Sequence, residues 1–236
     1  MSPPVIVPVI HAVTDDLILS QRGFLLRARA VMHALGARGA VHLRARAVTG
    51  ARLHALALAL RPAAERTGCW LVVNDRLDVA LAAGADGVQL TSRSMTVADA
   101  HAVIAGAASP DGGRAIAIGA SVHTSDDARI AAHAGADWCV AGHVFPTRSH
   151  PGEPPRGVPL ISTIVQAVAI PCLAIGGVRP EHLAALRAAG AHGAAAISGI
   201  WGADDAERAA TDYLSAYDAR HDEPGTPGVA GSGVAP

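Results

Sequence analysis

The sequence contains no lysine, because all 19 of its basic residues are arginines. Lysine supplies the nitrogen of Schiff bases, the anchor of pyridoxal phosphate and the phosphate-binding side chain of P-loops. The absence of lysine therefore excludes these three kinds of chemistry. A phosphate bound by this protein must be held by backbone N–H groups, hydroxyls, histidine or arginine.

Two further scarcities argue against nucleic acid and membranes as partners. Aromatic residues make up 3% of the 236 residues, and the formal net charge is −1. Few aromatic rings leave few platforms for base stacking, and a near-neutral chain lacks the positive field that attracts polyanions. No apolar run approaches the length of a membrane span, and residues 1–12 lack the basic start of a signal peptide. We expect a cytoplasmic protein that binds neither nucleic acid nor membrane.

Cysteine is also scarce. Cys69, Cys139 and Cys172 are odd in number and widely spaced, and no CxxC motif occurs. This pattern provides neither a disulfide framework nor a thiolate zinc site. We expect three buried free thiols in a reducing compartment.

Short apolar runs alternate along the chain with alanine-, leucine- and arginine-rich segments of helical spacing. The alternation predicts eight β-α units in a chain close to the roughly 250 residues typical of a (β/α)8 TIM barrel. We therefore expect a single-domain α/β barrel over residues 1–218, followed by a disordered tail over 219–236. A doubly wound parallel sheet is the alternative, since periodicity does not show closure. The expected strands are 5–13, 39–43, 70–73, 87–90, 115–118, 138–141, 172–175 and 193–197, and the expected helices are 24–35, 51–67, 76–83, 96–104, 126–134, 160–167, 180–189 and 204–217.

Polar residues and glycines follow the expected strands, whose ends meet at one rim of a barrel, where active sites lie. Gly176 and Gly177 follow the seventh strand, and Ser198 and Gly199 follow the eighth. Glycine lets backbone N–H groups approach an anion, and the loops after strands seven and eight are the usual phosphate seat of this fold. We predict that these four residues bind a phosphate. The alternative is that the glycines only turn the chain.

Histidines follow two of the strands. His143 comes directly after the sixth strand, where it would project into the mouth and exchange protons near neutral pH. We predict that His143 is the catalytic residue. His123 follows the fifth strand and is predicted to contact the ligand, the alternative being a loop histidine that caps the next helix.

Five further residues are predicted to bind substrate. Arg44 ends the second strand, and its forked donors suit a carboxylate or phosphate unless a nearby acidic loop pairs with it. His42 shares the strand face of Arg44. Asn74 ends the third strand and offers both a donor and an acceptor, although an Asn-Asp pair is equally a helix cap. Ser121 and Thr147 follow or end the fifth and sixth strands.

Carboxylates are few at this rim. Asp15 and Asp75 are the two that could face it, and scattered aspartates are more typical of helix caps than of a metal site. We expect no metal and no cofactor.

Together these strand-end segments resemble the thiamine phosphate synthase/TenI superfamily over about residues 5–217. The resemblance implies a (β/α)8 barrel that binds a thiazole phosphate at its rim. The motifs are specific only as a set: Val13-Thr14-Asp15, His42-Leu43-Arg44, Asn74-Asp75-Arg76, Gly84-Ala85-Asp86-Gly87-Val88-Gln89-Leu90, residues 119–123, Phe145-Pro146-Thr147 and residues 174–177.

Two activities occur in this superfamily. Thiamine phosphate synthases join a pyrimidine diphosphate to a thiazole phosphate, with magnesium held by the aspartate of an Asn-Asp pair and by a second aspartate after strand four. Asp75 matches the first aspartate, whereas Ser94 stands in place of the second and Ser92 in place of a glutamine. Arg46 and His150 stand where lysines are expected. One carboxylate would support magnesium diphosphate poorly.

The TenI-like thiazole tautomerases have Gly-His-Val-Phe where the synthases usually have Gly-Pro-Ile-Phe, and residues 142–145 have the tautomerase form, as do residues 156–160. The resemblance therefore implies a thiazole tautomerase of thiamine biosynthesis, which aromatises a carboxythiazole ethyl phosphate tautomer. His143 would move the ring proton, and Arg44 would pair with the carboxylate. The alternatives are a thiamine phosphate synthase with an altered diphosphate site and a non-catalytic barrel that binds thiazole phosphate. The expected partners are the small-molecule thiazole phosphate and further copies of the chain in a homo-oligomer.

Overall fold

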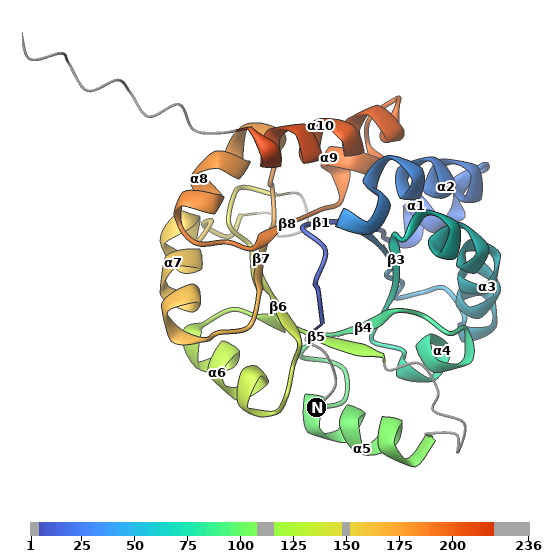
Figure 1. Cartoon of the computed structure of the whole chain (residues 1–236), viewed down its shortest axis with the longest axis horizontal. Coiled ribbons are helices and arrows are strands. Elements are labelled where there is room, and N and C mark those ends of the chain that lie inside the picture. The colour runs from blue at the N-terminus through green and yellow to red at the C-terminus, as the bar shows by residue number, and fades with distance from the viewer. Residues whose placement is uncertain (1–4, 108–115, 148–151, 220–236) are drawn as a thin grey trace, which may run out of the picture.

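Eight parallel strands close into a barrel with helices around it. The computed structural model describes residues 5–107, 116–147 and 152–219. Each strand pairs with the next and β8 pairs with β1, so the sheet has no free edge. Figure 1 looks along the barrel and shows the strands at the centre and the helices outside. This closure confirms the expected TIM barrel and excludes the doubly wound sheet.

The strands are short and almost entirely buried, as expected for a parallel sheet covered on both faces. The predicted strand 115–118 ends too early, because β5 continues through Gly119 to Val122. A Cβ atom at Gly119 would lie 2.1 Å from the ring of Trp138, so the glycine makes room for that indole inside the barrel. The strands are β1 Ile10–Val13, β2 Gly39–Leu43, β3 Trp70–Asn74, β4 Gly87–Leu90, β5 Ala117–Val122, β6 Trp138–Gly142, β7 Cys172–Ile175 and β8 Gly193–Ala196.

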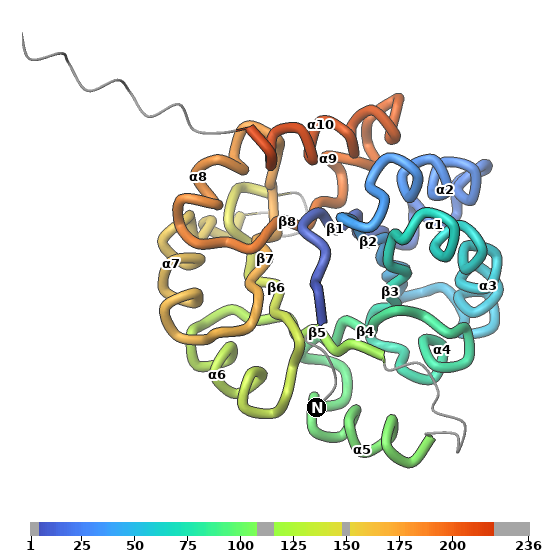
Figure 2. Tube along the Cα trace, in the orientation of Figure 1, coloured from blue at the N-terminus to red at the C-terminus, as the bar shows by residue number. Residues whose placement is uncertain are grey.

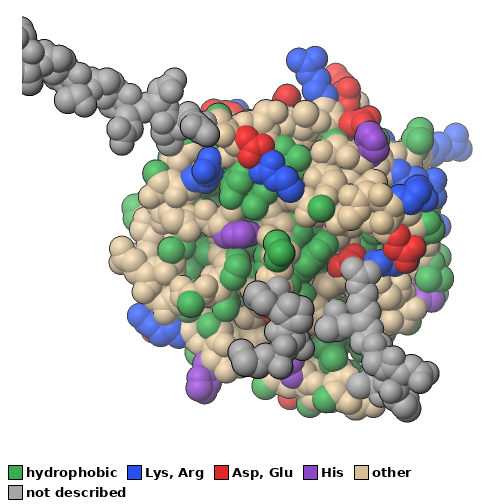
Figure 3. All heavy atoms as spheres, viewed as in Figure 1, with side chains coloured by type: hydrophobic (Ala, Val, Ile, Leu, Met, Phe, Trp, Pro, Cys, Tyr) green, Lys and Arg blue, Asp and Glu red, His purple; other side chains and the backbone are tan. Residues whose placement is uncertain are grey.

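Residues 5–9 were expected to begin the first strand but instead cross the end of the barrel at which the strands start (Figure 2). Val7 is buried in this position and packs with the residues of the barrel interior. Pro8 has no N–H with which to join a ladder, which explains why the strand begins only at Ile10. Figure 3 shows the same face of the molecule, with hydrophobic side chains around its centre. The mouth formed by the other ends of the strands lies on the far side.

The predicted helices are present, α2 with the predicted bounds and the others with shifted ends, and two short helices were not predicted. These are α1 and α9, which are too short to show a helical period in the sequence. Gly84, Gly135 and Gly190 follow helix ends with positive φ, as their repeated Ala-Gly-Ala context predicts. The helices are α1 Asp16–Ser20, α2 Phe24–Leu35, α3 Gly50–Thr67, α4 Leu77–Ala82, α5 Val97–Ala107, α6 Ser125–His133, α7 Gly157–Ala167, α8 Leu183–Ala188, α9 Ser198–Trp201 and α10 Ala206–Asp218, with short 3-10 turns at Gly36–Arg38 and Pro180–His182.

The core has two parts. A large apolar layer fills the space between the strands and the helices, and a smaller one fills the barrel interior around Trp138. Cys69, Cys139 and Cys172 are buried and free, which confirms the prediction for them. Within the described ranges, no helix combines the length and apolar composition needed to cross a membrane. The predicted disordered tail and His150 lie outside the described residues, except for the first tail position.

Candidate active site at the mouth of the barrel

His143 lies directly after β6, at the mouth, and only 6% of its surface is exposed. The loop that carries it is tied to β7, because the N–H of Val144 donates to the carbonyl oxygen of Ile175 at 2.9 Å. From the other side, the N–H of Arg156 donates to the carbonyl oxygen of His143 at 3.1 Å. The peptide bond between Gly142 and His143 is cis. His143 therefore directly follows β6, and its backbone is held from two neighbouring segments.

Gly176 and Gly177 follow β7 with φ values of +98° and +63°, which favour glycine. A Cβ atom at Gly176 would lie 2.4 Å from the Cβ of His143, and one at Gly177 would lie 2.3 Å from the carbonyl oxygen of Pro146. The two glycines therefore let the His143 loop pack against the end of β7. Within the described ranges, neither glycine N–H donates a hydrogen bond, so both remain available to an anion.

Ser198 and Gly199 open α9, directly after β8, where the first N–H groups have no acceptor within the helix. A Cβ atom at Gly199 would lie 2.0 Å from the hydroxyl of Tyr213, which donates to the carbonyl oxygen of Val178 at 2.6 Å. Burial raises the pKa of Tyr213, so this hydroxyl stays a neutral donor. The loops after β7 and β8 therefore meet at Tyr213, a residue that sequence reasoning missed.

His123 lies beside the end of β6. Its Nδ1 is 2.9 Å from the carbonyl oxygen of Gly142, which can only accept, so Nδ1 carries the hydrogen and Nε2 is an acceptor in the neutral ring. The N-cap of α6 is Thr124 and not His123. The structure thus rejects the helix-cap alternative and links His123 to His143 through the Gly142 carbonyl.

Arg44 follows β2 and is half-buried. Its N–H donates to the hydroxyl of Thr14 at 3.0 Å, which fixes its backbone at the rim. Within the described residues its guanidinium makes no ion pair with an acidic loop, so the alternative considered for it is not observed. Burial and the nearby cations of Arg46 and Arg93 lower the pKa of Arg44, and the carboxylates of Asp75 and Asp15 only partly oppose this shift. An anion bound at this position would relieve the repulsion among the three guanidinium groups.

Asp16 holds the loop after β2 and was not predicted from the sequence. Its carboxylate accepts hydrogen bonds from the N–H groups of Arg46, Ala47 and Val48 at 2.9 to 3.1 Å. Burial alone would raise the pKa of Asp16, but these three donors outweigh burial and lower it. The side chain of Arg46 therefore extends from a fixed backbone near Arg44.

The two rim aspartates have different roles. Asp15 caps α1 as predicted, because its carboxylate accepts from the N–H of Ile18 at 2.9 Å. The cap prediction for Asp75 is wrong. Asp75 has a left-handed backbone and accepts from the N–H and hydroxyl of Thr91 at 3.0 and 2.7 Å and from the hydroxyl of Ser94.

A divalent cation does not fit these donors. One oxygen of Asp75 already accepts from Thr91 and Ser94, and Ser94 provides a hydroxyl where hard cations prefer a carboxylate. Across residues 5–107, 116–147 and 152–219, no three His, Cys, Asp or Glu side chains gather in a way that could hold an ion.

The structure corrects the prediction that His42 contacts substrate directly. Its Nε2 is 2.8 Å from Nδ1 of His11, and its Nδ1 is 3.0 Å from Oδ1 of Asn74, so both ring nitrogens are engaged inside the barrel. Asn74 ends β3 and is not a helix cap. His42 therefore contacts the mouth only through Asn74. Sequence reasoning missed His11. The signal for it was the alternation of side chains along β1, which turns every second residue toward the barrel interior.

Ser121 and Thr147 both lie near the mouth. The hydroxyl of Ser121 accepts from Nε2 of Gln89 at 3.2 Å, whereas Thr147 is half-buried beyond Pro146. Gln89 on β4 was not among the predicted site residues. It is buried, and its Oε1 accepts no hydrogen bond from the described residues. A buried acceptor beside Asn74 and Ser121 is suited to a ligand donor.

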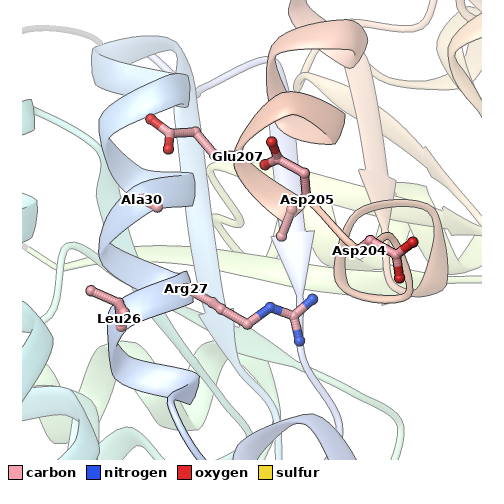
Figure 4. A pocket seen from close by; sticks show the side chains of 7 residues that line it. Leu26, Arg27, Ala30, Asp204, Asp205 and Glu207 are labelled. Carbon is pink, nitrogen blue, oxygen red and sulfur yellow. The ribbon is translucent and has the colours of Figure 1, made fainter.

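A hollow of about 350 Å³ lies elsewhere, on the outer surface between α2 and the start of α10 (Figure 4). Two of its charged residues, Arg27 and Asp205, have structural partners. Arg27 donates to the carbonyl oxygens of Trp201 and Ala203, and Asp205 caps α10. The contacts of these residues stabilise the packing of the outer helices, and the hollow lies apart from the mouth of the barrel.

Comparisons with known proteins find a matching family and several relatives. A family profile described as thiamine monophosphate synthase (TMP-TENI) matches residues 10–200. The thiamine biosynthesis bifunctional protein ThiM/ThiE of Symbiobacterium thermophilum is 43% identical over 66% of this chain, which spans only 31% of that larger protein. The thiamine-phosphate synthase of Chlorobium luteolum is 37% identical over 76% of this chain and 82% of its own length.

A solved structure is similar as well. The thiamine phosphate pyrophosphorylase of Pyrococcus furiosus superposes with a TM-score of 0.73 at 29% identity, covering 89% of this chain and 95% of that one. These findings confirm the superfamily expected from the strand-end motifs, while the TenI branch stays a prediction. Since the family profile spans most of the sequence, the chain belongs to the thiamine monophosphate synthase (TMP-TENI) family.

Proposed function

We propose that this member of the family is a thiazole tautomerase, which aromatises a carboxythiazole ethyl phosphate tautomer by moving a proton. The observation that carries the proposal is the position of His143. An imidazole stands at the mouth on a backbone held by β7 and by Arg156. A backbone held in this way supports a role for the imidazole in general acid-base catalysis, which needs the group within hydrogen-bond reach of the proton it transfers.

The reaction takes a proton from a ring carbon and returns one to an exocyclic carbon, so it consumes no further reagent. His143 accepts the first proton and delivers the second, because an imidazole exchanges protons near neutral pH. His123 is the second group on hand. Its Nδ1–H is held by the Gly142 carbonyl, which leaves Nε2 as an acceptor.

Two anionic groups of the substrate have separate seats in this proposal. The N–H groups of Gly176, Gly177, Ser198 and Gly199 hold the phosphate, as expected for the loops after strands seven and eight. Arg44 pairs with the carboxylate, since its guanidinium forms no ion pair within the described residues, although Asp75 and Asp15 lie near enough to act on its charge. Asn74, Ser121 and Thr147 contact the ring.

A thiamine phosphate synthase is the second candidate, and the names of the similar proteins favour it. The cations of Arg44, Arg46 and Arg93 would also suit a diphosphate. Against this candidate, Asp75 accepts hydrogen bonds from Thr91 and Ser94, and Ser94 offers a hydroxyl where a second carboxylate would be needed to hold magnesium. The donor set of the mouth thus supports the tautomerase more strongly.

The test is turnover of the carboxythiazole tautomer, followed by the absorbance change on aromatisation, in the unmodified protein and in His143→Ala and His143→Asn. We expect turnover to fall by about 10²–10⁴-fold in both variants, the usual contribution of a general acid-base group. Affinity for the aromatic product, measured by calorimetry, should stay nearly constant.

Three other results would overturn the proposal. Full activity in His143→Ala would exclude His143 as the base and make His123 the next candidate. Product binding without turnover in the unmodified protein would indicate a non-catalytic barrel. Release of diphosphate from a pyrimidine diphosphate and a thiazole phosphate would identify a synthase.

A further inference from the structure

A chain of hydrogen-bonding groups runs through the barrel interior toward the mouth. His11 Nε2 is 3.1 Å from the carbonyl oxygen of Pro8, His11 Nδ1 is 2.8 Å from His42 Nε2, and His42 Nδ1 is 3.0 Å from Oδ1 of Asn74. His11 is 0% exposed, His42 is 1% exposed and Asn74 is 4% exposed. Nothing in the proposed reaction uses the two buried imidazoles.

This series of hydrogen bonds has three contacts, and two neutral imidazoles do not carry enough hydrogens for all three. A carbonyl oxygen only accepts, so the contact with Pro8 and the contact with Oδ1 of Asn74 each need a hydrogen on the imidazole nitrogen. The contact between His11 and His42 needs a third. Two neutral rings carry two hydrogens, and a third makes the pair a cation.

The surroundings do not support a buried cation. Burial lowers the pKa of both His11 and His42. The one further titratable group that acts on the pair among the described residues is His192, whose Nε2 is 2.8 Å from the carbonyl oxygen of Val7. The edge of the Trp138 ring closes another side. In the part of the chain that the structure describes, no carboxylate contacts either imidazole to balance a charge, so the pair is neutral near neutral pH.

Neutral rings satisfy every contact in one arrangement only. His11 donates from Nε2 to Pro8, His42 donates from Nε2 to His11 Nδ1, and His42 Nδ1 is then a bare acceptor. Such an acceptor requires the NH₂ group of Asn74, which a half-turn of the amide provides without changing its shape.

We propose that His11 and His42 are positioning residues, which fix the orientation of the Asn74 amide and thereby the group that Asn74 offers to the mouth. In the neutral pair, Asn74 donates to His42 and turns its carbonyl oxygen to the mouth, where it accepts from a ligand. When the His11–His42 pair binds a further proton, His42 Nδ1 carries a hydrogen. The Asn74 amide then turns so that its Oδ1 accepts a hydrogen bond from His42 Nδ1. The use of Asn74 by a substrate rests on the proposed function, whereas the amide orientation does not.

Nuclear magnetic resonance tests the orientation directly, because Asn74 is the only asparagine in the sequence. Labelling with [¹⁵N]asparagine and [¹⁵N]histidine gives a single asparagine side-chain amide. Near neutral pH we expect a scalar coupling across the hydrogen bond between Nδ2 of Asn74 and Nδ1 of His42, and Nε2–H tautomers in both rings. A hydrogen on His42 Nδ1, with no such coupling, would overturn the proposal.

Two variants separate positioning from simple packing. In His42→Gln the side chain offers one donor and one acceptor, like the neutral Nε2–H ring, but takes up no proton. We expect the Asn74 amide signal of this variant to stay unchanged on acidification, whereas that of the unmodified protein shifts as the pair binds a proton. In Asn74→Asp, an ionised carboxylate only accepts, so His42 Nδ1 should carry a hydrogen near neutral pH. A bare Nδ1 in that variant would refute the proposal.

These signals are read without substrate, so they report on the amide even if the protein is not a tautomerase. If Asn74→Asp does not fold, the coupling in the unmodified protein still decides between the two orientations. Loss of the amide response in His42→Gln would support the relay, and an identical response in both proteins would refute it.

Discussion

Acid should destabilise this protein through His42, and the change His42→Gln should remove a defined part of that loss. Burial lowers the pKa of His42 from 6.5 to about 4, although its hydrogen bond with Asn74 partly opposes the shift. Between these two values the unfolded chain binds a proton that the folded chain does not. Stability is therefore complete above the unfolded pKa and falls as the pH decreases toward the folded pKa.

The size of the pKa shift of His42 determines how much stability is lost in acid. Linkage gives a loss of about 2 kcal/mol by about pH 5, rising to about 3 kcal/mol by about pH 4. His11 acts in the same direction, because burial and the neighbouring His42 lower its pKa as well. Carboxylates whose pKa is lowered, such as Asp127, also stabilise the folded protein, and this contribution is lost in more acidic solution. The loss is the same in the unmodified protein and in His42→Gln.

The assay is urea denaturation of the unmodified protein and of His42→Gln, each at about pH 7.5 and about pH 5. Comparing the pH-induced change within each protein cancels the intrinsic effect of the substitution. We expect the loss on acidification to be about 2 kcal/mol smaller in His42→Gln. Equal losses in the two proteins would refute the reasoning, because they would show that His42 binds its proton at the same pH in both states.

Three further predictions concern the mouth. Gly176→Ala should destabilise the fold by about 2–5 kcal/mol in urea denaturation, since it adds a methyl group 2.4 Å from His143 Cβ to an unfavourable φ of +98°. Gly84→Ala is the matched control, because Gly84 has φ +62° but no atom within 4 Å of its added Cβ. This variant should lose only about 1–2 kcal/mol of its free energy of unfolding. Equal losses in the two variants would contradict the packing argument. Arg44→Ala should weaken binding of the carboxythiazole phosphate by about 10–150-fold, the value of a charged hydrogen bond, while calorimetry with a thiazole phosphate that lacks the carboxylate should show little change. An equal loss for both ligands would place Arg44 at the phosphate instead. Turnover of the tautomer should persist in excess chelator, because Ser94 supplies no carboxylate to a hard cation, and strict magnesium dependence would contradict this reading of the site.

Much of the fold followed from local signals. Helix α2, Phe24–Leu35, has the predicted bounds because its apolar positions repeat with a helical period. Residues 5–9 are apolar and β-branched in part, yet they form no strand, because Pro8 interrupts the ladder and the segment closes the end of the barrel. Residues 119–121 have small side chains that carry little strand signal, and the Trp138 ring inside the barrel explains why a glycine stands at position 119.

Some features of the candidate site could be predicted from the sequence, and others depend on the tertiary structure. His143 and Gly176 were predicted as site residues because each directly follows a strand, and parallel strand ends share one rim. Their mutual contact was not predicted, since it depends on how closely the loops after β6 and β7 approach. Asp75 was misassigned as a cap because Thr91 and Ser94, its actual partners, come from the loop after the next strand.

The sequence by itself determined the repeating units, the strand ends that supply the mouth and the absence of lysine, because these depend on local period and on residue identity. The tertiary structure decided which side chains meet. His11 and His42 are 31 residues apart and Asn74 is a further 32 away, yet the register of β1, β2 and β3 places them in one hydrogen-bonded chain. Barrel closure and burial create that chain, because they remove water from three polar groups and leave them only one another as partners.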